Sequence, residues 1–270
     1  MSPATVEPVV WTLRAPRRYL CYELPDEFVP PETEEAVAHL GETVGDMLGV
    51  KALTPMVRKL TSMQWMVVFF HGAERCHRVA TYEDGRSGSV AYIPRSAEVI
   101  LFDCQHRFLY GSSPTMERVT DILAALASCF PERHRAQPFQ PVRFNVHQLR
   151  LLSAVHRHPT APASPWKHLT LKSLAWKEAG EDGTVTRQLY PTDGFEAFDF
   201  AACDWMPRMV SVGMKLTPPA KDQGYVVELF HQTSLFRATL SPVTLPAVGA
   251  LLRFSKDVAR QEGGRCRHVG

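Results

Sequence analysis

The sequence predicts an α+β fold in which a β-α-β4/5-α unit occurs twice, with antiparallel sheets covered by helices. Apolar residues recur at helical spacing in four segments, and short runs rich in β-branched and aromatic residues lie between them. The two halves also match without gaps when the chain is shifted by 128 positions, which indicates an internal duplication. The matched residues are Val99 with Val227, Leu101-Phe102 with Leu229-Phe230, Phe108 with Phe236, Ser113-Pro114 with Ser241-Pro242, and Leu123 with Leu251.

The first expected helix begins near Pro31, where acidic residues suit the positive end of the helix dipole. It ends before Gly49, which fits the left-handed position after a helix. The second begins at Ser113-Pro114, with serine as the N-cap, and stops before Pro131.

The third expected helix runs from Asn145 to His158. The fourth begins near Ser241-Pro242 and reaches Gly263-Gly264, and Pro246 indicates a start a few residues later, after Thr244.

Strands are expected between these helices, in runs separated by turn residues. In the first half they are Tyr19–Leu24, Gln64–His71, Cys76–Glu83, Ser89–Ile93, Glu98–Asp103 and Arg107–Tyr110. In the second half they are Val142–Phe144, His168–Trp176, Thr184–Tyr190, Arg208–Thr217, Tyr225–His231 and Leu235–Leu240.

These elements divide the chain into an N-terminal half, residues 1–132, and a C-terminal half, residues 133–270, which are able to pack as one domain. The segment 131–141 holds three prolines and suits a linker. The order of elements, though no residue motif, is similar to that of TATA-binding-protein-like duplicated saddles. That similarity assigns no functional residue.

Composition excludes several classes of protein. The hydrophobic fraction of 45% and the charged fraction of 21% are those of a globular chain rather than a disordered one. The six cysteines are scattered without a C-x-x-C pair, which disfavours a disulfide scaffold and a structural zinc site. The N-terminal residues lack a signal-peptide pattern, and no apolar run approaches the length of a membrane span. We therefore expect a cytoplasmic protein without a membrane partner.

The net charge of +2 conceals a strong asymmetry along the chain. Residues 19–50 contain no lysine or arginine, whereas residues 133–177 contain no aspartate or glutamate. A basic segment can neutralise phosphates, although a solvated basic face that pairs with an acidic helix is the simpler interpretation. The candidate contacts to nucleic acid or a partner are Arg133, Arg135, Arg143, Arg150, Arg157, Lys167 and Lys172.

Two H-x-T motifs, His168-Leu169-Thr170 and His231-Gln232-Thr233, suggest an enzymatic alternative. Paired H-x-T motifs resemble those of the 2H phosphoesterases, and this resemblance implies that the histidines act as acid and base while the hydroxyls hold phosphate. The repeat register argues against it, because it places Asp103 rather than a second motif opposite His231.

Other catalytic and cofactor sites are not indicated. Neither G-x-x-x-x-G-K-[ST] nor G-x-G-x-x-G is present, so no nucleotide cofactor is expected. His147, His156 and His158 do not share a helix face, and no metal is expected.

We therefore expect a binding or scaffold subunit rather than an enzyme, which contacts nucleic acid or a larger protein assembly through its basic central segment. A 2H-like phosphodiester-acting enzyme and a purely structural oligomer subunit are the alternatives. The expected partners are accordingly nucleic acid, another protein or a second copy of the chain.

Overall fold

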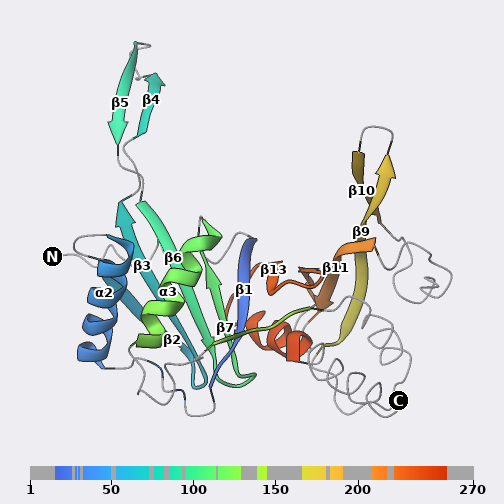
Figure 1. Ribbon diagram of the computed structural model, residues 1–270, viewed down its shortest axis with the longest axis horizontal. Coiled ribbons are helices and arrows are strands. Elements are labelled where there is room, and N and C mark those ends of the chain that lie inside the picture. Colours follow the sequence, from blue (N-terminus) through green and yellow to red (C-terminus); the bar gives the residue numbers. More distant parts are fainter. Residues whose placement is uncertain are drawn as a thin grey trace.

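The computed structural model describes residues 16–25, 28, 30, 33–49, 53–72, 76–81, 86–92, 95–113, 115–128, 139–144, 166–180, 183–190, 208–217 and 222–253. An 11-stranded antiparallel sheet forms the body of the molecule (Figure 1). Its strand order is β10-β9-β11-β12-β13-β1-β7-β6-β3-β2, with β8 paired to β1. A separate pair of strands, β4 and β5, forms a hairpin that extends from the body (Figure 1).

The strands and the two complete helices have the following bounds. They are β1 (Arg17–Glu23), α2 (Glu34–Leu48), β2 (Thr54–Thr61), β3 (Gln64–Gly72), β4 (Cys76–Thr81), β5 (Ser87–Tyr92), β6 (Arg95–Asp103), β7 (Phe108–Ser112), α3 (Met116–Ser128), β8 (Gln140–Pro141), β9 (His168–Gly180), β10 (Gly183–Leu189), β11 (Met209–Thr217), β12 (Tyr225–Phe230) and β13 (Leu235–Ala238). A further helix includes residues 245–253.

The prediction of an internally duplicated α+β fold with separate helix-covered sheets is wrong. Strand accounts for 50% of the structure and helix for 25%, and the strands join in one large antiparallel sheet. The reason lies in β1, which pairs with β13 through Arg17–Leu20 and with β7 through Leu20–Glu23. Because both edges of β1 are used, strands from the two ends of the chain become one sheet.

Most individual elements lie where the sequence places them. The N-cap of α2 is Thr33, whose hydroxyl accepts a hydrogen bond from the Ala36 N–H at 3.1 Å. Gly49 ends the helix in the left-handed conformation, with φ 64°, as expected. The expected helix at residues 145–158 and the division between residues 132 and 133 lie outside the described residues.

The last helix begins with a reciprocal pair of caps. The Ser241 hydroxyl accepts from the Thr244 N–H at 3.2 Å, and the Thr244 hydroxyl accepts from the Ser241 N–H at 2.8 Å. The helix therefore begins after Thr244, as Pro246 indicates.

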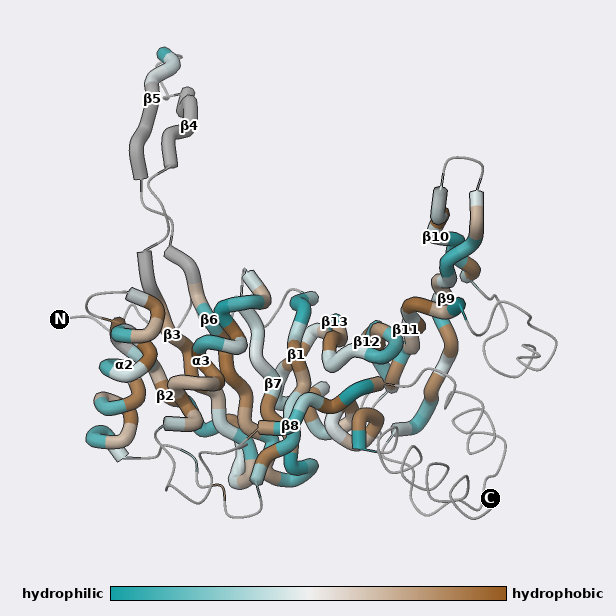
Figure 2. The backbone as a smooth tube through the Cα atoms, in the orientation of Figure 1, coloured by the Kyte–Doolittle hydropathy of each residue, from teal (hydrophilic) through white to brown (hydrophobic). Residues whose placement is uncertain are grey.

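The sheet carries helices on both faces. The helices α2 and α3 cover one face of β3, β6 and β7 through Leu40, Val44, Val119 and Ile122, and Figure 2 shows these strands as largely hydrophobic beneath them. The helix at 245–253 packs on the opposite face, in a second core that draws residues from β1, β3, β6, β7, β9 and β11 to β13. None of the helices within the described residues is both long and apolar enough to cross a membrane.

Candidate nucleic-acid interface

The face of β1 that points away from the second core carries an arginine. Tyr19 and Cys21 are fully buried against that core, so alternation places Arg18 on the opposite face, where it is exposed. On the neighbouring strand β13, Phe236 and Ala238 are buried and Arg237 is exposed for the same reason. The register aligns Arg18 directly with Arg237.

A third arginine joins this face from the segment 139–144. Val142 and Phe144 are buried in the second core, and Arg143 between them is exposed. Two backbone hydrogen bonds hold this segment at the β12–β13 turn: Phe144 N–H donates to the Thr233 carbonyl at 3.0 Å, and Gln232 N–H donates to the Phe144 carbonyl at 2.7 Å. Alternation therefore brings Arg143 to the face of Arg18 and Arg237.

The same face extends over β12 and β11. The register aligns Arg237 with Glu228 and Val226 with Lys215. The Glu228 carboxylate accepts a hydrogen bond from the Ser211 hydroxyl at 3.1 Å. We call the surface formed by Arg18, Arg143, Lys215 and Arg237 the basic sheet face. Within the described residues, none of these four cations makes an ion pair with a carboxylate.

Apolar residues lie beside the charges on this face. Leu20 is aligned with Leu235, and both are half-buried. Phe230, at the end of β12, is half-buried and lies on the same face as Val226 and Glu228. Cations beside partly exposed aromatic and aliphatic side chains are a combination found on surfaces that bind single-stranded nucleic acid.

The structure places only part of the predicted basic segment. Arg143 contributes to the basic sheet face, and Lys172 is exposed on β9, where the pairing with β11 is irregular. Lys167 instead forms an exposed ion pair with Asp222 at 3.2 Å. The other candidates, Arg133, Arg135, Arg150 and Arg157, lie outside the described residues.

The two H-x-T motifs do not come together. His168 is aligned with Thr217 at one end of β11, whereas the His231 N–H donates to the carbonyl of Val210 at the other end. The strand from Val210 to Thr217 spans about 23 Å at the usual rise of about 3.3 Å per residue. One phosphate therefore cannot contact both histidines.

The threonines of the two motifs also have different surroundings. The Thr233 hydroxyl donates to the Phe230 carbonyl at 3.1 Å and accepts from the Leu235 N–H at 3.2 Å, so it holds the β12–β13 turn. Thr170 lies within β9, aligned with Lys215. This geometry gives the 2H-like alternative no support.

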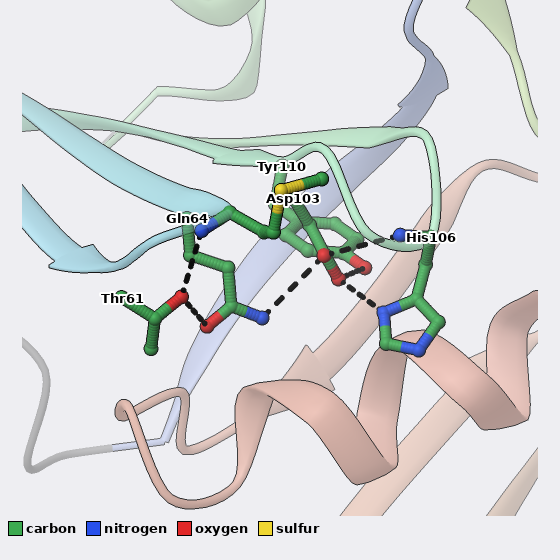
Figure 3. Close-up of polar contacts among 6 residues, drawn as sticks. Thr61, Gln64, Asp103, His106 and Tyr110 are labelled. Carbon is green, nitrogen blue, oxygen red and sulfur yellow. Dashed lines mark hydrogen bonds and ion pairs between the residues drawn. The ribbon is translucent and has the colours of Figure 1, made fainter.

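Asp103 is a buried acid at the end of β6, on the side of the sheet opposite the basic sheet face (Figure 3). One oxygen of the Asp103 carboxylate contacts His106 Nδ1 at 2.8 Å and accepts from the Tyr110 hydroxyl at 3.2 Å. The other oxygen accepts from Gln64 Nε2 at 3.4 Å and from the His106 N–H at 3.3 Å. Burial, and then the Asp103 charge, raises the pKa of Tyr110 well above its ordinary value.

The geometry of this cluster is that of a structural brace. Both Asp103 oxygens are engaged, and the His106 side chain is only 12% exposed. The last helix packs against Asp103 and His106 at Gly249, where an added Cβ atom would collide with the Asp103 carboxylate and the His106 ring. The absence of a side chain at Gly249 therefore lets the helix pack directly on the cluster.

The part of the chain that the structure describes contains no group of three or more histidine, cysteine, aspartate or glutamate residues placed to hold a metal ion. His147, His156 and His158 lie outside that part.

Sequence reasoning missed Arg18, Lys215 and Arg237. Arg18 and Arg237 each occupy the polar position of an alternating strand, beside buried Tyr19 and Phe236. That alternation predicts which side chains point away from the core. The position of Arg18 directly opposite Arg237 depends on how the strands pair, which the alternation does not reveal. Comparison with known proteins identifies no relative, since no family model and no curated protein matches the chain.

Proposed function

We propose that this protein is a non-catalytic binding protein that holds single-stranded nucleic acid across its basic sheet face. The observation that carries the proposal is the direct alignment of Arg18 with Arg237. Like charges directly opposite each other on antiparallel strands are destabilising, and no carboxylate of the described residues lies within ion-pair distance of either guanidinium, although Glu228 is aligned with Arg237 on its other side. A phosphate bound between the two guanidinium groups offsets this repulsion through charge-assisted hydrogen bonds.

The surroundings of the pair favour nucleic acid over an acidic protein surface. Arg143 extends the positive charge toward the β12–β13 turn, so that successive phosphates can follow the strands. Phe230 offers a ring on which a base can stack, and Leu235 offers an apolar contact beside it. An open sheet face with basic and aromatic residues suits a single strand, whose bases are accessible, better than a duplex.

Binding of the purified chain to fluorescently labelled oligonucleotides tests the proposal. We expect anisotropy titrations to show binding of single-stranded DNA or RNA at about 50 mM salt. The logarithm of the binding constant should fall with the logarithm of the salt concentration with a slope of about −2, because three arginines each contribute about 0.7 for a single strand. Double-stranded DNA and a polyglutamate peptide of matched charge are the comparison ligands.

Two outcomes overturn the proposal. One is the absence of oligonucleotide binding at low salt. The other is equal or tighter binding of the polyglutamate peptide, which would instead identify the basic sheet face as a contact for an acidic protein.

A further inference from the structure

The β9–β10 hairpin leaves the body of the molecule (Figure 1). The strand β11 pairs with β9 only as far as Trp176, whereas β9 and β10 continue as a pair to Gly180 and Gly183. Within the described residues, the outer part of the hairpin is therefore a two-stranded ribbon. Two strands alone are marginally stable in water, and a third strand or a packed face is usually needed.

The free side of this ribbon is the strand β10, at one end of the sheet order. All seven of its residues are exposed. They include Val185, which is 43% exposed, and Leu189, which is 36% exposed, and they are followed by Tyr190 at 68%. In the described part of the chain, no strand pairs with the outer edge of β10, so its backbone groups remain available there.

The sequence of β10 lacks the usual protection of an edge strand. Natural edges are commonly blocked by lysine, proline or a bulge, and Gly183–Leu189 contains neither lysine nor proline. Its pairing with β9 continues from Gly183 to Leu189 without a register shift. Its only charged residue, Arg187, already pairs with Glu178 of β9 at 3.0 Å.

We infer that β10 pairs antiparallel with β10 of a second copy of the chain, around a two-fold axis at Thr186. This register places Thr186 opposite its own copy and Arg187 opposite Val185 of the partner. Threonine pairs are favourable across antiparallel strands, and the aliphatic part of arginine can cover valine. A register centred on Arg187 would instead oppose two like charges.

The resulting dimer contains a continuous four-stranded sheet in the order β9-β10-β10-β9. The outer part of each β9–β10 hairpin thereby gains the additional strands that it lacks in one chain alone. The two-fold symmetry makes this contact self-limiting, because the pairing uses the β10 edge of both chains. The β10–β10 pairing involves only the seven residues of each strand, so we expect a dissociation constant for the dimer on the order of micromolar. The inference does not depend on nucleic-acid binding.

Sedimentation velocity across a range of concentrations of the full chain measures the dimer. We expect the unmodified chain to dimerise and Thr186→Lys to weaken the dimer by about tenfold or more, because two lysines then face each other across the axis. Ala179→Lys is the matched control, since it adds the same charge at an exposed position on β9 and should leave the dimer unchanged. Circular dichroism melting curves establish that both variants are folded.

A cysteine pair tests the register independently. Under oxidising conditions, Thr186→Cys should form an intermolecular disulfide, because directly opposite Cα atoms lie about 4.5–5.5 Å apart. Thr184→Cys should not, because its copy is displaced by four residues, or about 13 Å, along the seam. A chain that stays monomeric at about 100 µM, where the expected micromolar affinity requires a dimer, overturns the inference, as does equal cross-linking of the two variants.

Discussion

Replacing both Arg18 and Arg237 with alanine is expected to weaken binding of a single-stranded oligonucleotide by about 30-fold. This estimate assigns about 1 kcal/mol to each lost charge-assisted contact with phosphate. The salt slope should also fall by about 1.4, since two of the three arginine contacts to phosphate are removed. Anisotropy titration at several salt concentrations measures both quantities.

The folded protein should not lose stability in this variant. Because Arg18 and Arg237 are exposed and directly opposed, their removal relieves a like-charge contact, which offsets the loss of Arg237 beside its aligned neighbour Glu228. We therefore expect an unchanged or slightly raised melting temperature together with the loss of affinity. This combination separates a binding role from a structural role for the two arginines.

The matched control removes the same charge from distant strands. Arg58 on β2 and Lys177 on β9 are both exposed, and neither lies on β1, β11, β13 or the segment 139–144, which carry the basic sheet face. The Arg58→Ala/Lys177→Ala variant should bind the oligonucleotide with nearly the affinity of the unmodified chain. An equal loss in both double variants would mean that net charge, rather than the basic sheet face, determines binding.

Replacing Asp103 with alanine is expected to lower the free energy of unfolding by about 4 kcal/mol. The carboxylate is fully buried and contacts His106, Gln64 and Tyr110, so its removal leaves two buried polar side chains and the largely covered His106 without this acceptor. The space vacated beneath Gly249 adds a cavity against which the last helix packs less well. Urea unfolding followed by circular dichroism gives the difference.

Asp103→Asn is the conservative companion to this variant. Asparagine keeps one acceptor oxygen and the same shape, so the loss should be about half as large. If Asp103→Ala unfolds at the same urea concentration as the unmodified chain, the cluster does not brace the last helix. Oligonucleotide binding by the folded fraction should persist in both variants, because Asp103 faces the second core rather than the basic sheet face.

Local patterns predicted the elements well where the chemistry is local. Gly49 ends α2 and Ser241 with Thr244 begins the last helix, as expected, whereas α2 begins at Glu34, after the N-cap Thr33, rather than near Pro31. The strand β2 was missed, because Pro55, Arg58 and Lys59 interrupt its apolar pattern. That strand forms through pairing with β3, which a single segment does not reveal.

The order and pairing of the strands could not be predicted from local sequence patterns. The matching halves suggested two sheets, but β1 uses both of its edges and joins the strands into one. The basic sheet face depends on the same pairing, because Arg18 and Arg237 are far apart in the sequence. Among the residues of the basic sheet face, Arg143 was predicted from the charge of its segment, whereas Arg18 in β1 and Arg237 in β13 could be identified only from the strand register.

The most direct test of the proposed function locates the bound strand on the protein. A single-stranded oligonucleotide carrying photoreactive bases is cross-linked to the full chain, and the modified peptides are identified by mass spectrometry. We predict cross-links on the segments that contain Arg18, Arg143, Phe230 and Leu235, with their yield reduced in the Arg18→Ala/Arg237→Ala variant. Cross-links confined to other surfaces, such as α2 or the β9–β10 hairpin, would contradict the assignment of the basic sheet face as the nucleic-acid interface.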